Sequence, residues 1–296
     1  MEPVTSNLPV CPICSAASAF YGRRFGALRK RDFDLHRCPT CHLAFVANPW
    51  IEFNSIYSES YYSGKGADPL LDYVFELEHP DRTIRRSEWK GILKAVNHLH
   101  PVTNATRWMD YGCGNGGQVR YLRQTAGCEA VGFEDGWIAD QARQHGIPVL
   151  TRAQMEESFG TFDIVSLIEV IEHCTDPAAV FADVRRLLKP GGLVYLTTGN
   201  ALPHRDKLIE WPYFIPEIHV SLFEPGTIET SLRNAGLEPF RPGWIPGWGD
   251  IIRFKLLKNL KVRENRIWHN WLPWSLLGRL IDRKLQLSSH PAGRLR

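Results

Sequence analysis

The sequence contains no apolar run of about 18 residues, which is the length that a membrane-spanning helix requires. Its first residues, MEPVTSNLPVCPIC, also lack the basic stretch followed by an apolar stretch that marks a signal peptide. No internal repeat or low-complexity segment stands out. These absences argue against a membrane-spanning helix and a repeat architecture, and they predict a cytoplasmic location.

The chain also has little excess charge of either sign, with a formal net charge of +3 over 296 residues. The charges are unevenly placed, because residues 252–296 hold 11 Lys/Arg and 2 Asp/Glu, a local balance of +9. The length predicts about two domains, and an apolar content of 44% suffices for a sizeable core. The basic character therefore belongs to the C-terminal segment rather than to the whole chain.

Cysteines are few and odd in number, at seven, yet four of them form two C-x-x-C pairs, Cys11/Cys14 and Cys38/Cys41. In a reducing compartment such pairs bind metal more often than they form disulfides. Four thiolates are the tetrahedral set that zinc prefers, and a set without an open position indicates a structural zinc. The pattern predicts a zinc ribbon over residues 1–48; cysteines without metal are the alternative.

Residues 49–104 are expected to form a linker and a helical lead-in to the next domain. The linker carries three tyrosines, Tyr57, Tyr61 and Tyr62, which either close over a ligand or pack against the protein. Apolar residues recur at helical spacing over residues 72–100, so we expect one helix there.

Short apolar runs alternate with helical stretches over residues 105–240, which we take as the central domain. This alternation predicts an α/β fold with a doubly wound, Rossmann-like parallel sheet. Asp176 and Pro177 have the pattern of a helix start, and the Gly191–Gly192 pair is expected to end the same helix, with Lys189 in its last turn. In such sheets the ligand lies at the carboxyl ends of the strands.

The stretch RWMDYGCGNGGQ, residues 107–118, follows the first predicted strand and holds four glycines in six positions. Gly112, Gly114 and Gly117 match the G-x-G-x-x-G of a dinucleotide site, whereas Gly116 completes the G-x-G-x-G of an S-adenosylmethionine (SAM) site. Glu134 ends the second predicted strand, where a carboxylate accepts hydrogen bonds from a ribose diol of either cofactor. The loop and Glu134 therefore leave both cofactors open.

Three further features favour SAM: Asp110 before the loop, EVIEH followed by DP after the fourth strand, and LLKPGG before the fifth. In this order they resemble the class I SAM-dependent methyltransferases. The residue that binds the adenine amine in that family is not obvious here; Gln154 is our candidate and Glu156 the alternative. The resemblance implies a set of SAM-binding residues, namely Asp110, Gly112, Gly114, Gly116, Glu134, Gln154, Ile168 and Glu169.

The EVIEH stretch places Glu169, Glu172 and His173 at positions i, i+3 and i+4, which share one face if a helical turn begins there. It looks like the motif of the ubiquinone-pathway O-methyltransferases and of small-RNA 2′-O-methyltransferases. That resemblance implies a magnesium ion held by these three residues and by His219. Many metal-independent relatives carry a similar stretch as capping or packing residues; in that case His219 or His173 is the expected general base.

Residues 241–296 are expected to form a basic, aromatic, helical C-terminal extension. Two stretches are amphipathic, and Trp268, Trp271 and Trp274 lie between or at the start of them. Packing on the core or oligomerisation is the default interpretation. Contact with an anionic membrane surface is the alternative.

The whole layout resembles a group of bacterial methyltransferases that act on sugars, surface-glycan precursors or natural products. It implies SAM-dependent methyl transfer to a small hydroxylated acceptor, most simply to oxygen, with transfer to carbon as the alternative. An RNA methyltransferase is the second hypothesis, based on the arginine-rich stretch 23–31 and the basic tail, although the modest overall charge argues against a nucleic-acid partner. A SAM-binding interaction protein without catalysis and a nicotinamide oxidoreductase complete the alternatives.

Overall fold

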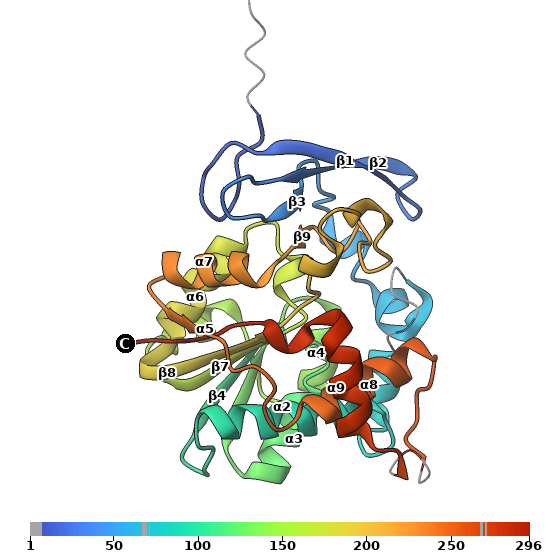
Figure 1. The fold of residues 1–296 in the computed structure, drawn as a ribbon. Coiled ribbons are helices and arrows are strands. Elements are labelled where there is room, and N and C mark those ends of the chain that lie inside the picture. The colour runs from blue at the N-terminus through green and yellow to red at the C-terminus, as the bar shows by residue number, and fades with distance from the viewer. Residues whose placement is uncertain (1–7, 67–69, 71, 267–268, 270) are drawn as a thin grey trace, which may run out of the picture.

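The computed structural model describes residues 8–66, 70, 72–266, 269 and 271–296. Its centre is a seven-stranded sheet flanked by helices (Figure 1). The strand order is β10-β11-β8-β7-β4-β5-β6, and the strands from β8 to β6 run parallel. Their bounds are β4 Arg107–Tyr111, β5 Glu129–Phe133, β6 Val149–Leu150, β7 Phe162–Ile168, β8 Leu188–Thr197, β10 Glu238–Phe240 and β11 Ala292–Arg294. The doubly wound α/β fold expected from the sequence is confirmed.

The central strands are buried along almost their whole length, because helices cover the sheet on both faces. In β4 the side chains from Trp108 to Tyr111 are all buried, and β7 is similar. A strand covered on both faces shows a continuous apolar run instead of alternation. The flanking helices are α2 Arg85–Leu99, α3 Gly117–Ala126, α4 Trp137–Gln144, α5 Arg152–Glu157, α6 Pro177–Leu187 and α7 Pro225–Asn234.

Helix α6 starts as expected but ends earlier than expected. The Asp176 side chain accepts a hydrogen bond from Ala179 N at 3.0 Å, and Pro177 occupies the first turn. The helix then stops at Leu187, so that Lys189 and the Gly191–Gly192 pair belong to β8. The reason is a long-range pairing: the backbone of residues 191–192 exchanges hydrogen bonds of 2.6 and 3.0 Å with residue 295.

The expected single helix over residues 72–100 is wrong, because the structure contains two helices there. Helix α1 spans Tyr73–Glu78, and α2 begins at Arg85. Pro80 lies in the break; it lacks a backbone N–H and restricts the residue before it, which ends the first helix.

The C-terminal segment is not a purely helical extension. Helices α8 (Trp248–Asn259) and α9 (Trp274–Leu285) form as the sequence indicates, but residues 292–294 then return to the central sheet as β11. This strand is antiparallel to both of its neighbours, β8 and β10. The two helices are therefore an insertion between the last two strands. None of the described helices combines the length and apolarity needed to cross a bilayer.

The N-terminal segment forms a second, four-stranded sheet, which lies at the top of Figure 1. Its strands are β1 Ala19–Gly26, β2 Arg31–Arg37, β3 Ala44–Val46 and β9 Ser221–Leu222, in the order β1-β2-β3-β9. Strand β9 comes from the segment just before α7, so the central domain supplies one edge of the N-terminal sheet.

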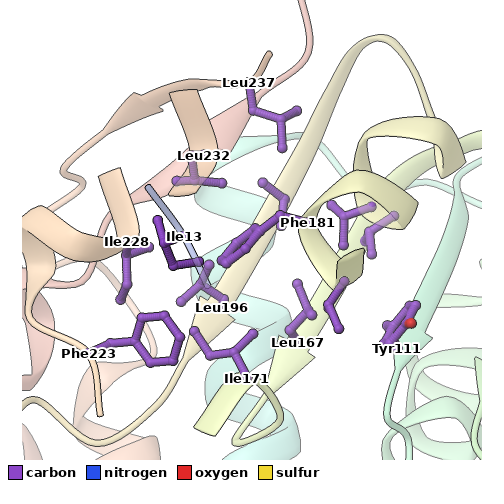
Figure 2. Close-up of a cluster of buried hydrophobic side chains, with 14 of the residues drawn as sticks. Ile13, Tyr111, Leu167, Ile171, Phe181, Leu196, Phe223, Ile228, Leu232 and Leu237 are labelled. Atoms are coloured by element: carbon purple, nitrogen blue, oxygen red, sulfur yellow. The ribbon is translucent and has the colours of Figure 1, made fainter. Parts of the chain in front are cut away.

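The two sheets are also joined through a shared apolar core. Ile13 lies beside Phe223 and Ile228 (Figure 2). The Thr227 hydroxyl donates to the carbonyl oxygen of Cys41 at 2.7 Å, which fixes the N-terminus of α7 against the cysteine cluster. The N-terminal module is therefore packed onto the central domain rather than tethered to it.

Candidate functional site

The glycine loop connects β4 to α3 at the carboxyl end of the sheet. Gly112, Gly114 and Gly116 have φ angles of +74°, +53° and +69°, a left-handed conformation that side chains strain. At Gly114 an added Cβ would lie 2.9 Å from the Tyr73 ring, so the loop also has no room for a side chain. The loop is a tight backbone turn that presents main-chain groups at the strand end.

Two carboxylates flank this loop, the buried Asp110 and the half-buried Glu134. Glu134 Oε2 accepts a hydrogen bond from Gly114 N at 2.9 Å, and Asp110 Oδ1 accepts from the Ser166 hydroxyl at 2.6 Å. Burial raises the pKa of Asp110 to about 7 and also raises the pKa of Glu134. A positively charged ligand would stabilise the ionised form of these carboxylates, whereas a pyrophosphate would add negative charge beside them. The two carboxylates therefore fit SAM, which carries a sulfonium and an ammonium.

The two candidates for the adenine edge are occupied by local contacts. Gln154 Oε1 accepts a hydrogen bond from Thr151 N at 2.9 Å and completes a capping box at the start of α5. Glu156 forms an ion pair with Arg152 at 2.8 Å. An adenine contact by Gln154 stays a prediction, as does one by Ile168 at the end of β7.

An aromatic wall, formed by Tyr57, Tyr62, Tyr73 and Trp137, lies between the glycine loop and the EVIEH segment. Tyr62 stacks on Trp137 with ring centroids 6.1 Å apart, and its ring meets the edge of Tyr73 at 5.6 Å. The Tyr57 hydroxyl lies 3.0 Å from Nδ1 of His173. The linker tyrosines thus pack in this structure, and they do so directly beside the candidate cofactor loop.

The EVIEH segment does not form a helical turn that begins at Glu169, which was the condition for the three residues to share one face. Glu169 has a φ of +54°, which is rare for a residue with a side chain, and only Ile171–His173 forms a 3-10 turn. Glu169 therefore stays outside the cluster of Glu172, His173 and His219, although the Tyr213 hydroxyl contacts both glutamates, at 3.4 Å from Glu169 and 2.6 Å from Glu172. Strained backbone of this kind concentrates at functional sites.

Glu169 is instead paired with a cation from the C-terminal insertion. Lys255 Nζ on α8 lies 2.8 Å from Glu169 Oε1, and both side chains are about three-quarters buried, with 22% and 28% exposed. Burial acts to raise the pKa of Glu169, but the Lys255 ammonium outweighs it and holds the pKa at about 2. The pair is therefore ionised.

The other three predicted ligands come together. One ligand atom from each of Glu172, His173 and His219 lies within 4.8 Å of the others. The two Glu172 oxygens accept hydrogen bonds from the hydroxyls of Tyr213 at 2.6 Å and Thr198 at 2.8 Å. Burial, with the nearby Glu169 charge, raises the pKa of Glu172 to about 8.

Both histidines are held in one tautomer by backbone carbonyls. Nδ1 of His173 is 2.9 Å from the oxygen of Ile218, and Nδ1 of His219 is hydrogen-bonded to the oxygen of Tyr213. A carbonyl only accepts, so each Nδ1 carries the proton and each Nε2 has a lone pair. Burial and the neighbouring His219 lower the pKa of His173 to about 3, which keeps that ring neutral.

The four residues implied as magnesium ligands do not fit that ion as one set. Three of them cluster, but Glu169 is neutralised by Lys255, and a divalent cation at this carboxylate would face an ammonium.

Removing one partner of the Lys255–Glu169 pair should destabilise the protein more than removing both. We expect Lys255→Met to lower the free energy of unfolding by about 2–3 kcal/mol, because it leaves a largely buried carboxylate unpaired. The double variant Lys255→Met/Glu169→Gln should recover more than half of that loss. Urea denaturation measures all three, and Lys261→Met, at an exposed lysine, is the control. A double variant as unstable as the single one would contradict the pairing.

The four N-terminal cysteines form a separate cluster. Sγ of Cys11 lies 3.4 Å from Sγ of Cys41, the Cys14–Cys38 pair has the same separation, and all four sulfurs lie within 4.8 Å of one another. A tetrahedral zinc with its usual bond lengths spaces its sulfurs by roughly 3.8 Å. None of the seven cysteines is in a disulfide. The donor set and its dimensions fit zinc.

Sequence reasoning missed Lys255, Tyr213 and Thr198. Lys255 is 86 positions from its partner, and nothing in the tail pattern points to that partner. One signal was available: Lys255 follows Ile251 and Trp248 at helical spacing, on the face that becomes buried. A lysine on an apolar face needs a counter-charge.

Comparisons with known proteins agree with this geometry. A family model described as "Methyltransferase domain" matches residues 70–240. The ubiquinone biosynthesis O-methyltransferase of Methylococcus capsulatus is 36% identical over 125 residues, covering 36% of this chain and 52% of that protein. The Bordetella pertussis protein of the same name is 30% identical over 154 residues, covering 45% of this chain and 62% of that protein. The chain thus spans about half to three-fifths of these two relatives.

A solved structure supports the fold. Phosphoethanolamine N-methyltransferase 2 of Haemonchus contortus, in complex with SAM, superposes with a TM-score of 0.51 at 16% identity, covering 85% of this chain and 61% of that chain. The family match spans more than half of the present chain, and the resemblance seen in the glycine loop and EVIEH motifs is confirmed. The chain belongs to the methyltransferase-domain family, with the class I SAM-dependent fold.

Proposed function

We propose that the protein transfers the methyl group of SAM to a hydroxyl oxygen of a small acceptor, such as a sugar, a glycan precursor or a natural product. The observation that carries this proposal is His219, whose Nδ1 donates to a backbone carbonyl and whose Nε2 is therefore a proton acceptor. The relatives named as O-methyltransferases support oxygen as the methylated atom.

Bound SAM supplies an electrophilic methyl carbon on a sulfonium. Gly114 and Glu134 hold the cofactor in this proposal, and Asp110 offsets its positive charge. His219 accepts the proton of the acceptor hydroxyl, because a neutral alcohol is a weak nucleophile. Tyr213 orients His219: their rings stack at a centroid distance of 4.2 Å, and its carbonyl fixes the tautomer.

Replacing His219 should affect turnover without affecting cofactor affinity. We expect His219→Ala to reduce kcat by about 100- to 1,000-fold, the usual contribution of a general base. Binding of S-adenosylhomocysteine, followed by calorimetry, should stay within about twofold of the wild type, well under 1 kcal/mol. His145→Ala is the matched control, because His145 is exposed on the far end of α4.

Turnover would be measured as SAM consumption with a panel of sugars, phenols and other hydroxylated acceptors. If His219→Ala turned over the best acceptor at the wild-type rate, His219 would not be the base. If no hydroxylated acceptor were methylated while S-adenosylhomocysteine still bound, the non-catalytic hypothesis would gain support.

The RNA hypothesis receives no support from the N-terminal hairpin. The arginines that suggested it have intramolecular partners instead of forming a free basic face. These contacts are Arg23 with Asp34, Arg24 with the carbonyls of Ile209 and Trp211, Arg29 with Ser55, and Arg31 with the carbonyl of Asn48.

We also propose that Cys11, Cys14, Cys38 and Cys41 bind one structural zinc. All four positions are sulfur, so a bound ion would have no open position for a substrate. The cluster packs against α7 rather than against the glycine loop, which agrees with a structural role.

A further inference from the structure

The exposed large apolar side chains of the described residues fall into two groups, one within residues 8–53 and one in the C-terminal insertion. Among the described residues, five of the twelve large apolar side chains that are exposed lie within residues 260–280. Single exposed leucines are common on protein surfaces, but a group of them on one segment indicates a contact site. The five are Leu260 (72% exposed), Trp271 (81%), Leu272 (40%), Leu276 (60%) and Leu280 (54%).

Helix α9 is apolar on two faces, and the protein covers one of them. Gly278 lies on the inner face, where an added Cβ would be 3.5 Å from Ile252 of α8, and Ile281 packs on the same core. Leu276 and Leu280 are one helical turn apart on the outer face and are exposed. Packing on the core, the default expectation for this tail, therefore accounts for the inner face of α9 only.

Basic residues flank the outer face. Arg279, Arg283 and Lys284 are exposed beside the two leucines. The segment 260–285 holds two acidic residues, and both have partners: Glu264 pairs with Arg82 at 2.9 Å, and Asp282 accepts hydrogen bonds from the backbone and hydroxyl of Ser288. The surface therefore combines apolar side chains with positive charge.

We propose that this tail surface, formed by the five apolar residues with Arg279, Arg283 and Lys284, docks onto an anionic lipid bilayer. An amphipathic helix with leucines and basic residues on its exposed face binds in the plane of such a surface. Charge complementarity favours lipid over a second copy of the chain, because a two-fold contact would place the same basic residues opposite one another. Trp268, which the sequence placed in the same group, lies outside the described residues.

The tail surface and the candidate site share one insertion. Helix α9 packs on helix α8, and α8 also holds Lys255, the ion-pair partner of Glu169. Docking would therefore hold the site close to the bilayer, which suits an acceptor with a lipid anchor and a hydroxylated head group. This last step rests on the proposed methyl transfer, whereas docking itself does not.

The test is co-sedimentation of the full chain with vesicles. We expect the protein to sediment with vesicles in which about a third of the lipid is phosphatidylglycerol, and to bind pure phosphatidylcholine vesicles at least about 30-fold more weakly. Raising the salt concentration should weaken the binding to the anionic vesicles. Equal binding to both kinds of vesicle, or to neither, would overturn the proposal.

Two pairs of variants locate the surface. Arg283→Gln/Lys284→Gln should weaken binding to the anionic vesicles by about 30-fold, which is roughly fivefold for each charge removed. Leu276→Ser/Leu280→Ser should weaken the same binding by at least about tenfold. The matched controls are Lys30→Gln/Lys207→Gln and Phe25→Ser/Leu28→Ser, at exposed positions in or beside the N-terminal sheet, and they should bind as the wild type does. Binding that survives both tail variants would overturn the assignment.

Light scattering and cofactor titration separate the alternatives. If the chain were a dimer that Leu276→Ser/Leu280→Ser made monomeric, the surface would be an oligomer interface and the proposal would be wrong. S-adenosylhomocysteine binding measured on the same samples reports the proposed function independently. A variant that loses vesicles but keeps this ligand is folded, and it supports the docking surface.

Discussion

Glu134→Ala should weaken the binding of S-adenosylhomocysteine by about 100-fold or more. The Glu134 carboxylate lies at the carboxyl end of β5, and it already accepts a hydrogen bond from Gly114 N at 2.9 Å. In the proposed complex it accepts from the ribose hydroxyls, and each hydrogen bond to a charged group contributes about 1.5–3 kcal/mol. Isothermal titration calorimetry measures the loss directly.

Asp135→Ala is the matched control for this experiment, because it removes the adjacent carboxylate, which is exposed. Its affinity for S-adenosylhomocysteine should stay within about threefold of the wild type, or under 1 kcal/mol. Glu134 also holds the glycine loop, so the thermal midpoint of each variant should be recorded. A folded Glu134→Ala protein with wild-type affinity would rule out the cofactor site proposed here.

Cys38→Ser should remove the zinc and destabilise the whole protein, not only its N-terminal module. Structural zinc sites supply folding free energy, and we expect a loss of more than about 3 kcal/mol. The loss should spread because Ile13 is buried in the core of the central domain (Figure 2) and because β3 pairs with β9. Val46 N also donates to the oxygen of Val220 at 2.9 Å, next to the proposed base.

Metal content and urea denaturation measure the two effects. The wild type should contain one zinc per chain, and Cys38→Ser should retain little or none. Cys128→Ala is the control, because Cys128 is buried in the central domain, away from the cluster, and this variant should keep its zinc. Full zinc content in Cys38→Ser, or a wild-type chain without metal, would contradict the assignment.

The sequence by itself determined the features that depend on neighbouring residues. The glycines at 112, 114 and 116 marked the candidate cofactor loop because their conformation is a local property, and all three have positive φ. Asp176 and Pro177 marked the start of α6, because helix capping also depends only on neighbouring residues. The alternation of short apolar runs with helical stretches indicated a doubly wound sheet, and the buried strands β4 and β7 agree with it. These signals sufficed for the fold class and the cofactor loop.

Only the tertiary structure decided how the polar residues meet. The spacing of EVIEH is helical, but a left-handed φ at Glu169 turns that side chain toward Lys255. A single backbone angle of this kind cannot be predicted from the spacing of residues in the sequence. Tyr213 and Lys255 come from segments 44 and 86 positions away from Glu169, and only the folded chain brings them into contact with it.

The C-terminal strand β11 is a second feature that could not be predicted from the sequence. Residues 292–294 are too few to produce an alternating pattern, and their strand is defined by its antiparallel hydrogen bonds to β8 and β10. Local sequence therefore determined where the chain turns and which faces are apolar. Long-range hydrogen bonding and charge pairing determined which side chains form the candidate site, since those energies depend on partners that are distant in sequence.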